Sequence, residues 1–313
     1  MRKIILLCGA LLLITGITYA QDEPTPYDIA LERILEAESS NATEIDLSNL
    51  DLRELPPEIG RLYQLENLDI SNNALTTLPG EISNLINLRG LEVSFNALTN
   101  LPTEIGELSD LEGLFLISNH LSTIPPEIGN LYNLKWIYLS SNNLNELPPE
   151  IGNLERLQGL DLNINSLDEL PPEIGNLTNL KWLLVSENFL TELPPEIGNL
   201  HSLCYLNIRN NDIRILPSEL VNLENINTDY CFGDGIYIGI HYSGNPITNP
   251  PHQVLEQDTA SILRYLDNPL WWYIQYFRVW LLLSTGLLAA LFLGFRYRQR
   301  RMLKSKKKRE ASA

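Results

Sequence analysis

The chain has 313 residues, with 39 Asp and Glu against 22 Lys and Arg, and its formal net charge at pH 7 is −17. Residues 21–295 are more acidic still, because they hold 38 Asp and Glu against 11 Lys and Arg. So much negative charge repels phosphate backbones and anionic surfaces, which disfavours nucleic acid as a partner and favours a basic partner or loosely held divalent cations.

Residues 1–20 have the pattern of a secretory signal peptide. Arg2 and Lys3 precede an apolar run, and the run ends at the small residue Ala20. This order of charged, apolar and small residues predicts cleavage after Ala20.

Residues 21–41 predict an N-terminal capping helix. A mostly apolar stripe recurs there at helical spacing and comprises Tyr27, Leu31, Ile34, Leu35 and Glu38. The stripe can cover the first unit of the repeat array that follows, since an end unit would otherwise expose its core.

Residues 42–251 are an array of 23-residue repeats. The segment "LPPEIGNL" occurs at Leu170–Leu177 and again at Leu193–Leu200. The full unit reads L-x-x-L-x-L-x-x-N-x-L-x-x-L-P-x-E-I-G-x-L, and we number its positions from the first leucine. Clear units start at Leu65, Leu88, Leu111, Leu134, Leu157, Leu180 and Leu203. A degenerate unit starts at Ala42, and a ninth begins near Tyr237.

Each unit predicts one short strand and one short helix. Positions three to seven alternate between apolar and other residues, as in Trp136-Ile137-Tyr138-Leu139, which indicates a strand with one buried face. In "PPEIG", proline suits the first turn of a helix, and the helix dipole favours the glutamate there. The repeated glutamates therefore predict a solvated convex face rather than a metal or acid–base site.

Position nine predicts a structural ladder of asparagines. The ladder comprises Asn73, Asn96, Asn119, Asn142, Asn165, Asn188 and Asn211. The chain leaves its strand at this position, and a stacked asparagine can donate to and accept from the backbone of the neighbouring turn. An unpaired buried amide would cost roughly 1–3 kcal/mol.

The end of the array is irregular. The interval from Asn211 to Asn245 is 34 residues instead of 23, and we place a looped insertion at Ile226–Ile236. Residues 252–269 predict a C-terminal capping helix. Its apolar face comprises Ile262, Leu263 and Leu266.

Residues 270–295 predict one transmembrane helix. Val279–Phe295 contains no charged residue, and the aromatic residues before it suit an outer interfacial belt. Residues 296–313 hold nine Lys and Arg, so the positive-inside rule places this tail in the cytoplasm. The expected product is a single-pass membrane protein whose array is extracytoplasmic, in a periplasm or at the cell surface. In such a compartment Cys204 and Cys231 could form a disulfide.

The repeat resembles known families. "LPPEIGNLxNLxxL" at 23-residue spacing is similar to the SHOC-type, Ras-scaffold-like and plant disease-resistance-like leucine-rich repeat proteins. "NPxTxPPxxVLEQDTASILRYL" resembles the closing segment of bacterial and ROCO-type arrays. The resemblance covers Tyr27–Asn268 and implies an α/β solenoid, with a curved parallel sheet on the concave face and short helices or 3-10 turns on the convex face. Because these families share a scaffold and differ in partners, it implies no activity.

No catalytic group stands out in the sequence. The four histidines are scattered, without the spacing of a zinc site, so we expect neither an enzyme nor a cofactor or bound metal. The remaining place for function is the concave sheet, where positions two, three and five point outward.

The second half of the predicted sheet is rich in aromatic residues. We take as candidate ligand-binding residues Phe115, Trp136, Tyr138, Asp161, Trp182, Leu184 and Tyr205. Clustered exposed aromatics mark interaction sites. The alternative is that they simply suit an exposed strand and stack on one another.

A sharper hypothesis is a slot between two indoles. Trp136 and Trp182 are two units apart, so their backbones would lie ~9–10 Å apart with Gly159 between them. Such a slot, beside Asp161, could hold an aromatic side chain, a cationic side chain or a sugar ring. Alternatively, the indoles close over Gly159.

Two classes of function remain. The first is a membrane-anchored recognition module that binds a protein or a glycan on its concave face and signals through a separate membrane partner. The second is a structural or adhesion spacer. The oligomeric state stays open.

Overall fold

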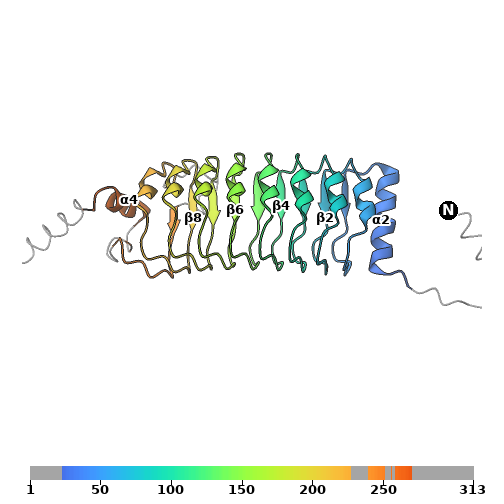
Figure 1. Ribbon diagram of the computed structural model, residues 1–313, viewed down its shortest axis with the longest axis horizontal. Coiled ribbons are helices and arrows are strands. Elements are labelled where there is room, and N and C mark those ends of the chain that lie inside the picture. Colours follow the sequence, from blue (N-terminus) through green and yellow to red (C-terminus); the bar gives the residue numbers. More distant parts are fainter. Residues whose placement is uncertain (1–22, 227–238, 251–254, 256–257, 270–313) are drawn as a thin grey trace, which may run out of the picture. The chain divides into compact units, whose positions relative to one another are not determined.

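The computed structural model describes residues 23–226, 239–250, 255 and 258–269. The chain divides into two compact units, Met1–Leu167 and Asp168–Ala313, and each is described by itself. Figure 1 shows the repeats in chain order, with the helix labelled α2 at one end of the first unit and α4 at one end of the second. The predicted signal peptide, nearly all of the predicted insertion, the predicted transmembrane helix and the basic tail lie outside the described residues.

The first unit opens with helix α2, Pro26–Ser40. The Thr25 hydroxyl accepts a hydrogen bond from the Asp28 amide at 3.2 Å, and the Asp28 carboxylate accepts one from the Thr25 amide at 3.0 Å. This reciprocal cap fixes the start of the helix. The helix ends at Asn41, which adopts a left-handed conformation with φ of 50°.

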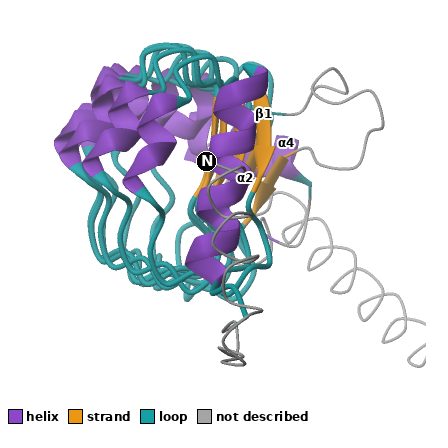
Figure 2. Ribbon diagram, turned by 90° about the vertical axis from the view of Figure 1, so that its right-hand side faces the viewer, coloured by secondary structure: helices purple, strands orange, loops and turns teal. Residues whose placement is uncertain are grey.

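The buried side of α2 differs from the predicted stripe. Its buried residues are Ala30, Ile34 and Ala37, whereas Leu35 is 43% exposed. Figure 2 shows α2 beside strand β1, which it contacts. Ile34 of the predicted stripe is buried, but the prediction was wrong for Leu35, because the small residues Ala30 and Ala37 share the buried side with Ile34 instead.

Six parallel strands follow in the first unit, each three residues long. They are β1 (Glu44–Asp46), β2 (Asn67–Asp69), β3 (Gly90–Glu92), β4 (Gly113–Phe115), β5 (Trp136–Tyr138) and β6 (Gly159–Asp161). Neighbouring strands pair so that equal repeat positions face each other, for example Asp46 with Asp69. Side chains at position four point into the core and those at positions three and five point away from it, so each outward row collects one position of every repeat.

Short 3-10 helices lie on the side of the repeats opposite to the strands, as Figure 2 shows in purple and orange. In the first unit they are η1 (Pro57–Arg61), η2 (Gly80–Asn84), η3 (Thr103–Glu107), η4 (Pro126–Asn130) and η5 (Pro149–Asn153). Each buries one isoleucine. Neighbouring helices pack so closely that a Cβ added to Gly106 would lie 2.5 Å from the carbonyl oxygen of Glu127.

The asparagines at position nine form a hydrogen-bonded ladder. The Asn142 side-chain oxygen accepts from the Leu121 amide at 3.0 Å, and its nitrogen donates to the carbonyls of Leu116 and Leu139 at 2.9 and 3.0 Å. The same contacts to the preceding repeat recur at Asn73, Asn96, Asn119 and Asn165. Each asparagine therefore joins two repeats through backbone groups that would otherwise be buried without partners.

The second unit repeats this pattern. Its parallel strands are β7 (Trp182–Leu184), β8 (Tyr205–Asn207) and β9 (Gly239–His241), and its 3-10 helices are η6 (Pro172–Asn176), η7 (Pro195–Asn199) and η8 (Ser218–Asn222). Asn211 bonds to the backbone of the preceding repeat through the Leu190 amide and the Val185 carbonyl, and Asn245 continues the ladder.

Helix α4, Thr259–Asp267, packs against η8 and starts at Asp258, whose carboxylate accepts from the Ser261 amide at 2.8 Å. It lies inside the range 252–269 predicted for the C-terminal cap. Its buried residues are Ile262, Tyr265 and Leu266. Leu263, which we expected on the buried face, is half-buried, and Tyr265 takes that place.

Two predictions, the transmembrane helix and the disulfide, involve residues outside the described ranges. In the described part of the chain, no helix has the length and apolar content needed to cross a bilayer. The span predicted at 270–295 lies outside that part. Cys204 is disulfide-bonded, and its predicted partner Cys231 lies outside the described residues, so that pairing stays a prediction.

Candidate binding face

The outward side chains of β1–β6 form a surface that we call the open sheet face of the first unit. A hollow of about 500 Å³ lies over β1–β4 on this face. Gly90 contributes no side chain to its floor, while Asn67 and Phe115 are among the residues that line it. The Asn67 side chain leans over Gly90, where an added Cβ would lie 2.6 Å from the Asn67 side-chain oxygen.

Three carboxylates at position five, which we call the carboxylate row, line this hollow. The row comprises Asp46, Asp69 and Glu92. Each accepts a hydrogen bond from the backbone amide two residues further on, with distances of 2.8, 2.9 and 2.9 Å. These bonds hold the carboxylates in fixed positions. At Asp46 the hydrogen bonds from Ser48 lower the pKa of the carboxyl, and the charge of Arg33 lowers it further.

Phe115 lines the far side of the hollow and is backed by Tyr138, and we call this stacked pair the aromatic wall. Their rings stack with centroids 5.2 Å apart and planes 26° apart. The Phe115 ring also leans over Gly113, where an added Cβ would lie 2.9 Å from the ring. This stacking is the arrangement that the alternative to a binding role predicted, yet both rings keep a partly exposed surface.

Asp161 is less accessible than the sequence suggested. It is only 9% exposed, and its carboxylate accepts from the Asn163 amide at 3.0 Å. Burial raises the pKa of the Asp161 carboxyl, although hydrogen bonds from Asn163 and Ser140 act in the opposite direction. The pKa of Tyr138 is also raised, chiefly by burial and further by the charge of Asp161. Gly159, on the same strand, is buried as well.

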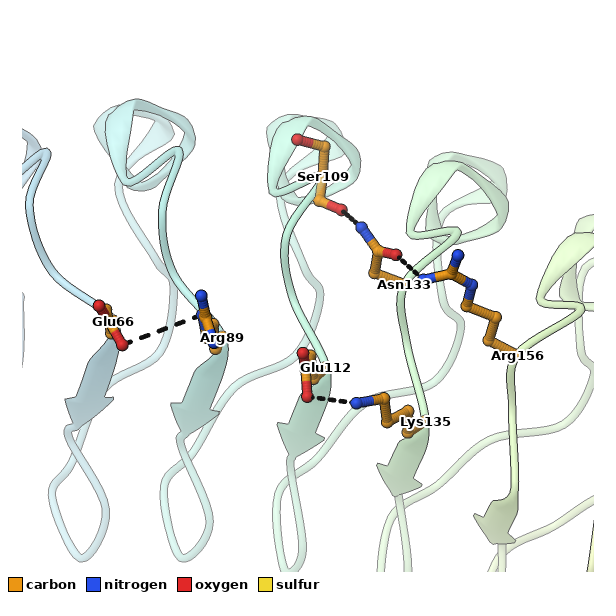
Figure 3. Close-up of polar contacts among 7 residues, drawn as sticks. All are labelled: Glu66, Arg89, Ser109, Glu112, Asn133, Lys135 and Arg156. Atoms are coloured by element: carbon orange, nitrogen blue, oxygen red, sulfur yellow. Dashed lines mark hydrogen bonds and ion pairs between the residues drawn. The ribbon is translucent and has the colours of Figure 1, made fainter.

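The row at position two is made of ion pairs that sequence reasoning missed. Figure 3 shows Glu66 paired with Arg89 at 3.9 Å, and Glu112 paired with Lys135 at 2.6 Å. Lys135, which lies beside the aromatic residues in the repeat pattern, is engaged by Glu112. This contact lowers the pKa of the Glu112 carboxyl. The alternation of acid and base at 23-residue intervals was the signal that could have revealed these pairs.

A second set of asparagine side chains, each just before the leucine that opens a repeat, also bonds to a neighbouring repeat. The Asn133 side chain donates to the Ser109 carbonyl at 2.8 Å and accepts from the Arg156 guanidinium at 2.5 Å, as Figure 3 shows. Asn87 makes the same type of bond to the Tyr63 carbonyl at 2.7 Å. These contacts tie neighbouring repeats together near the edge of the open sheet face.

The second unit carries the remaining candidate residues. Trp182 is only 8% exposed, so the prediction of an exposed indole was wrong for this residue. Leu184 and Tyr205 are half-buried, and the Tyr205 ring meets His241 edge-on with centroids 4.9 Å apart. The slot between Trp136 and Trp182 draws on both units and stays a prediction. Within the described ranges, no group of three or more His, Cys, Asp or Glu is placed to hold a metal ion.

Comparisons with known proteins agree with the repeat pattern. A family model described as leucine-rich repeat region matches residues 122–191, and a second, described as leucine rich repeat, matches residues 40–98 and 86–144. This chain is a leucine-rich repeat protein. The more specific repeat types that its sequence resembles remain predictions.

Two solved structures illustrate its similarity to other leucine-rich repeat proteins. A leucine-rich repeat protein of Leptospira interrogans is 33% identical with a TM-score of 0.59, and the match covers 71% of this chain and 60% of that one. The plant peptide hormone receptor RGFR1, solved in complex with RGF2, is 32% identical with a TM-score of 0.59. That match covers 68% of this chain and 34% of the receptor chain. A search of curated proteins found no match.

Proposed function

We propose that this leucine-rich repeat protein recognises a polypeptide partner on the open sheet face of its first unit. The observation that carries the proposal is the hollow over β1–β4, which has the carboxylate row along it and the wall of Phe115 and Tyr138 on its far side. A face that offers both aromatic surface and fixed charges can bind the apolar and the polar groups of a peptide at once. The similarity to a peptide hormone receptor in complex with RGF2 supports this reading.

We further propose that the recognition module is anchored to a membrane. The support is in the sequence: a signal-like segment at 1–20, an uncharged stretch at Val279–Phe295 and a basic tail behind it. In this arrangement the array faces the outside, and a signal would reach the cytoplasm through a separate membrane partner.

The polypeptide-binding proposal can be tested with the full chain in non-ionic detergent. A library of displayed dodecapeptides is selected against the protein, and the enriched peptides are measured against two variants. We expect Phe115→Ala to weaken binding at least tenfold, since it removes half of the aromatic wall. Tyr132→Ala is the matched control, because Tyr132 is an aromatic residue of the same unit that is 60% exposed and lies away from the open sheet face.

The possible outcomes separate the proposal from the spacer alternative. A spacer gives no enriched peptides. Enriched peptides that bind Phe115→Ala and the unsubstituted chain equally well would place recognition elsewhere and contradict the assignment to this face. Trp182→Ala in the same assay tests the predicted indole slot, with the thermal unfolding midpoint measured in parallel because Trp182 is buried.

A further inference from the structure

The first unit holds two rows of acidic residues that differ in how they are neutralised. At position two, Glu66 and Glu112 each face a cation supplied by the next repeat, at 3.9 and 2.6 Å. At position five, no Lys or Arg of the described residues lies within ion-pair distance of Asp69 or Glu92. At Asp46, the Arg33 guanidinium donates to the backbone carbonyl at 2.9 Å rather than to the carboxylate.

The carboxylate row is therefore a line of like charges on neighbouring strands. Adjacent strands are ~4.8 Å apart, and like charges placed directly opposite each other destabilise a sheet. Rotation of each carboxylate away from its neighbour is restricted, because it also accepts a hydrogen bond from the backbone amide two residues further on. The repulsion is then best relieved by a positive charge brought in from outside.

The shape of the hollow indicates which cation fits. Glu92 and Phe115 are register partners on β3 and β4, so a carboxylate and an aromatic ring lie side by side. A guanidinium can satisfy both, because its plane stacks on an aromatic face while its N–H groups donate to a carboxylate. A hydrated metal ion would gain nothing from stacking on the ring. Among the described residues, no group of three or more His, Cys, Asp or Glu is placed to hold a metal ion.

We propose that the hollow over β1–β4 binds an arginine side chain from an extended segment of the polypeptide partner, with the guanidinium between the carboxylate row and the Phe115 ring. The inference rests on the proposed function and specifies the class of partner. The charge complementarity of the hollow carries it: about 500 Å³ of space, three fixed carboxylates and one aromatic wall.

The test uses the full chain in non-ionic detergent and three octapeptide pools labelled with an uncharged dye. The pools share random flanking positions and differ in one central residue, which is arginine, its uncharged isostere citrulline, or glutamate. Fluorescence anisotropy measures binding. We expect the arginine pool to bind at least tenfold more tightly than the citrulline pool, and N-acetyl-arginine amide, a free cation without a peptide, to compete only weakly.

Matched variants locate the charge that matters. Asp69→Asn with Glu92→Gln keeps the hydrogen-bond acceptors for the backbone amides and removes two charges, so the fold should be retained and the preference for arginine lost. Glu66→Gln with Glu112→Gln removes two charges from the row that is already paired. We expect this control pair to keep the preference for arginine within twofold.

The outcomes distinguish this inference from the proposed function. Equal binding of the arginine and citrulline pools overturns the arginine inference, while peptides that still depend on Phe115 leave polypeptide recognition standing. Equal losses in both pairs of variants would mean attraction to general negative charge and would also overturn it. If no pool binds and the displayed library yields no peptide, both proposals fail.

Discussion

At the scale of single residues, the asparagine ladder makes the clearest prediction. Asn142→Ala removes an acceptor from the Leu121 amide and a donor from two carbonyls, all in a buried position. We expect unfolding to become easier by about 1–3 kcal/mol, because the backbone groups lose their partners without gaining water. Urea unfolding followed by circular dichroism measures the change.

The neighbouring Asn145 provides the control for that experiment. Its side chain is exposed, so Asn145→Ala should leave the free energy of unfolding within about 0.5 kcal/mol of the original value. Equal effects of the two substitutions would show that the ladder contributes no more than any asparagine of the repeat.

Asp161 and Asp46 predict opposite dependences of stability on pH. Burial raises the pKa of Asp161, so its charge is unfavourable in the folded state at neutral pH. Asp161→Asn should therefore raise the unfolding midpoint at pH 7, and the gain should shrink as the pH falls through the raised pKa towards the unfolded value.

The hydrogen bonds from Ser48 lower the pKa of Asp46, so its charged form is favoured in the folded state. Asp46→Asn should lower the unfolding midpoint at pH 7, and the loss should disappear as the pH falls from the unfolded value through the lowered pKa. Thermal unfolding between pH 3 and pH 7 on the same protein tests both signs, and a gain from both substitutions would contradict the assignment.

Some features of individual residues could not be predicted. The ladder could be predicted because position nine is asparagine in every clear repeat, whereas the residue type at position eight varies. Phe95 and Ile164 nevertheless share a left-handed backbone there, with φ of 59° and 56°. Glycine and asparagine are the residues that usually adopt such φ values. Phe95 and Ile164 therefore did not indicate a left-handed backbone at this position. The burial of Asp161 was also hidden, because it depends on the size of neighbouring side chains.

At the scale of elements, the 3-10 helices depend on their glycines. Gly106→Ala would place a Cβ 2.5 Å from the Glu127 carbonyl oxygen in the next helix, so neighbouring repeats must separate. We expect a loss of about 1–3 kcal/mol, as is typical of overpacking. Urea unfolding again measures it.

Gly80 is the matched control within the same type of helix. An added Cβ there would meet only the Glu104 side chain at 3.5 Å, which is an ordinary contact. Gly80→Ala should leave stability unchanged or raise it slightly, because alanine restricts the unfolded chain more than glycine does. A large loss from Gly80→Ala would mean that helix spacing is not the cause.

Elements were predicted well wherever the repeat sets them. Each strand of the first unit occupies positions three to five of its repeat, and each short helix begins at the expected proline or its equivalent. The caps were predicted less well, because a single helix has no repeats to compare. In α2 the predicted stripe included the buried Ile34, but it also included the exposed Leu35 and left out the buried Ala30 and Ala37.

At the scale of the whole molecule, the proposed topology can be tested with two engineered cysteines. Ser109→Cys lies in the array at an exposed position, and Ser305→Cys lies in the basic tail. On intact cells, a membrane-impermeant maleimide should label the first and not the second, and lysed cells should label both. The unsubstituted chain gives the background from the native cysteines. Labelling of Ser305→Cys in intact cells would reverse the proposed orientation.

The candidate site shows where reading the sequence stops being sufficient. The rows predicted to point outward divide into an acidic half with small residues and an aromatic half, and Asp161 and Trp182 of these rows are buried. We favoured the aromatic half, but Trp182 is buried, while the hollow lies mainly over the acidic half. The sequence gives the residue types on a face of the sheet, whereas the shape of that surface depends on how the side chains pack between strands.

The ion pairs at position two bear on how an array like this can grow or shrink by copying. Along the first unit their signs alternate from Glu66 to Arg89, Glu112 and Lys135. Deleting one repeat, such as residues 88–110, would bring Glu66 beside Glu112, whereas deleting two would bring it beside Lys135. Exposed pairs contribute at most about 1 kcal/mol each, so the bias is mild. The ladder of asparagines tolerates any copy number, but this row of charges favours repeats gained or lost in twos.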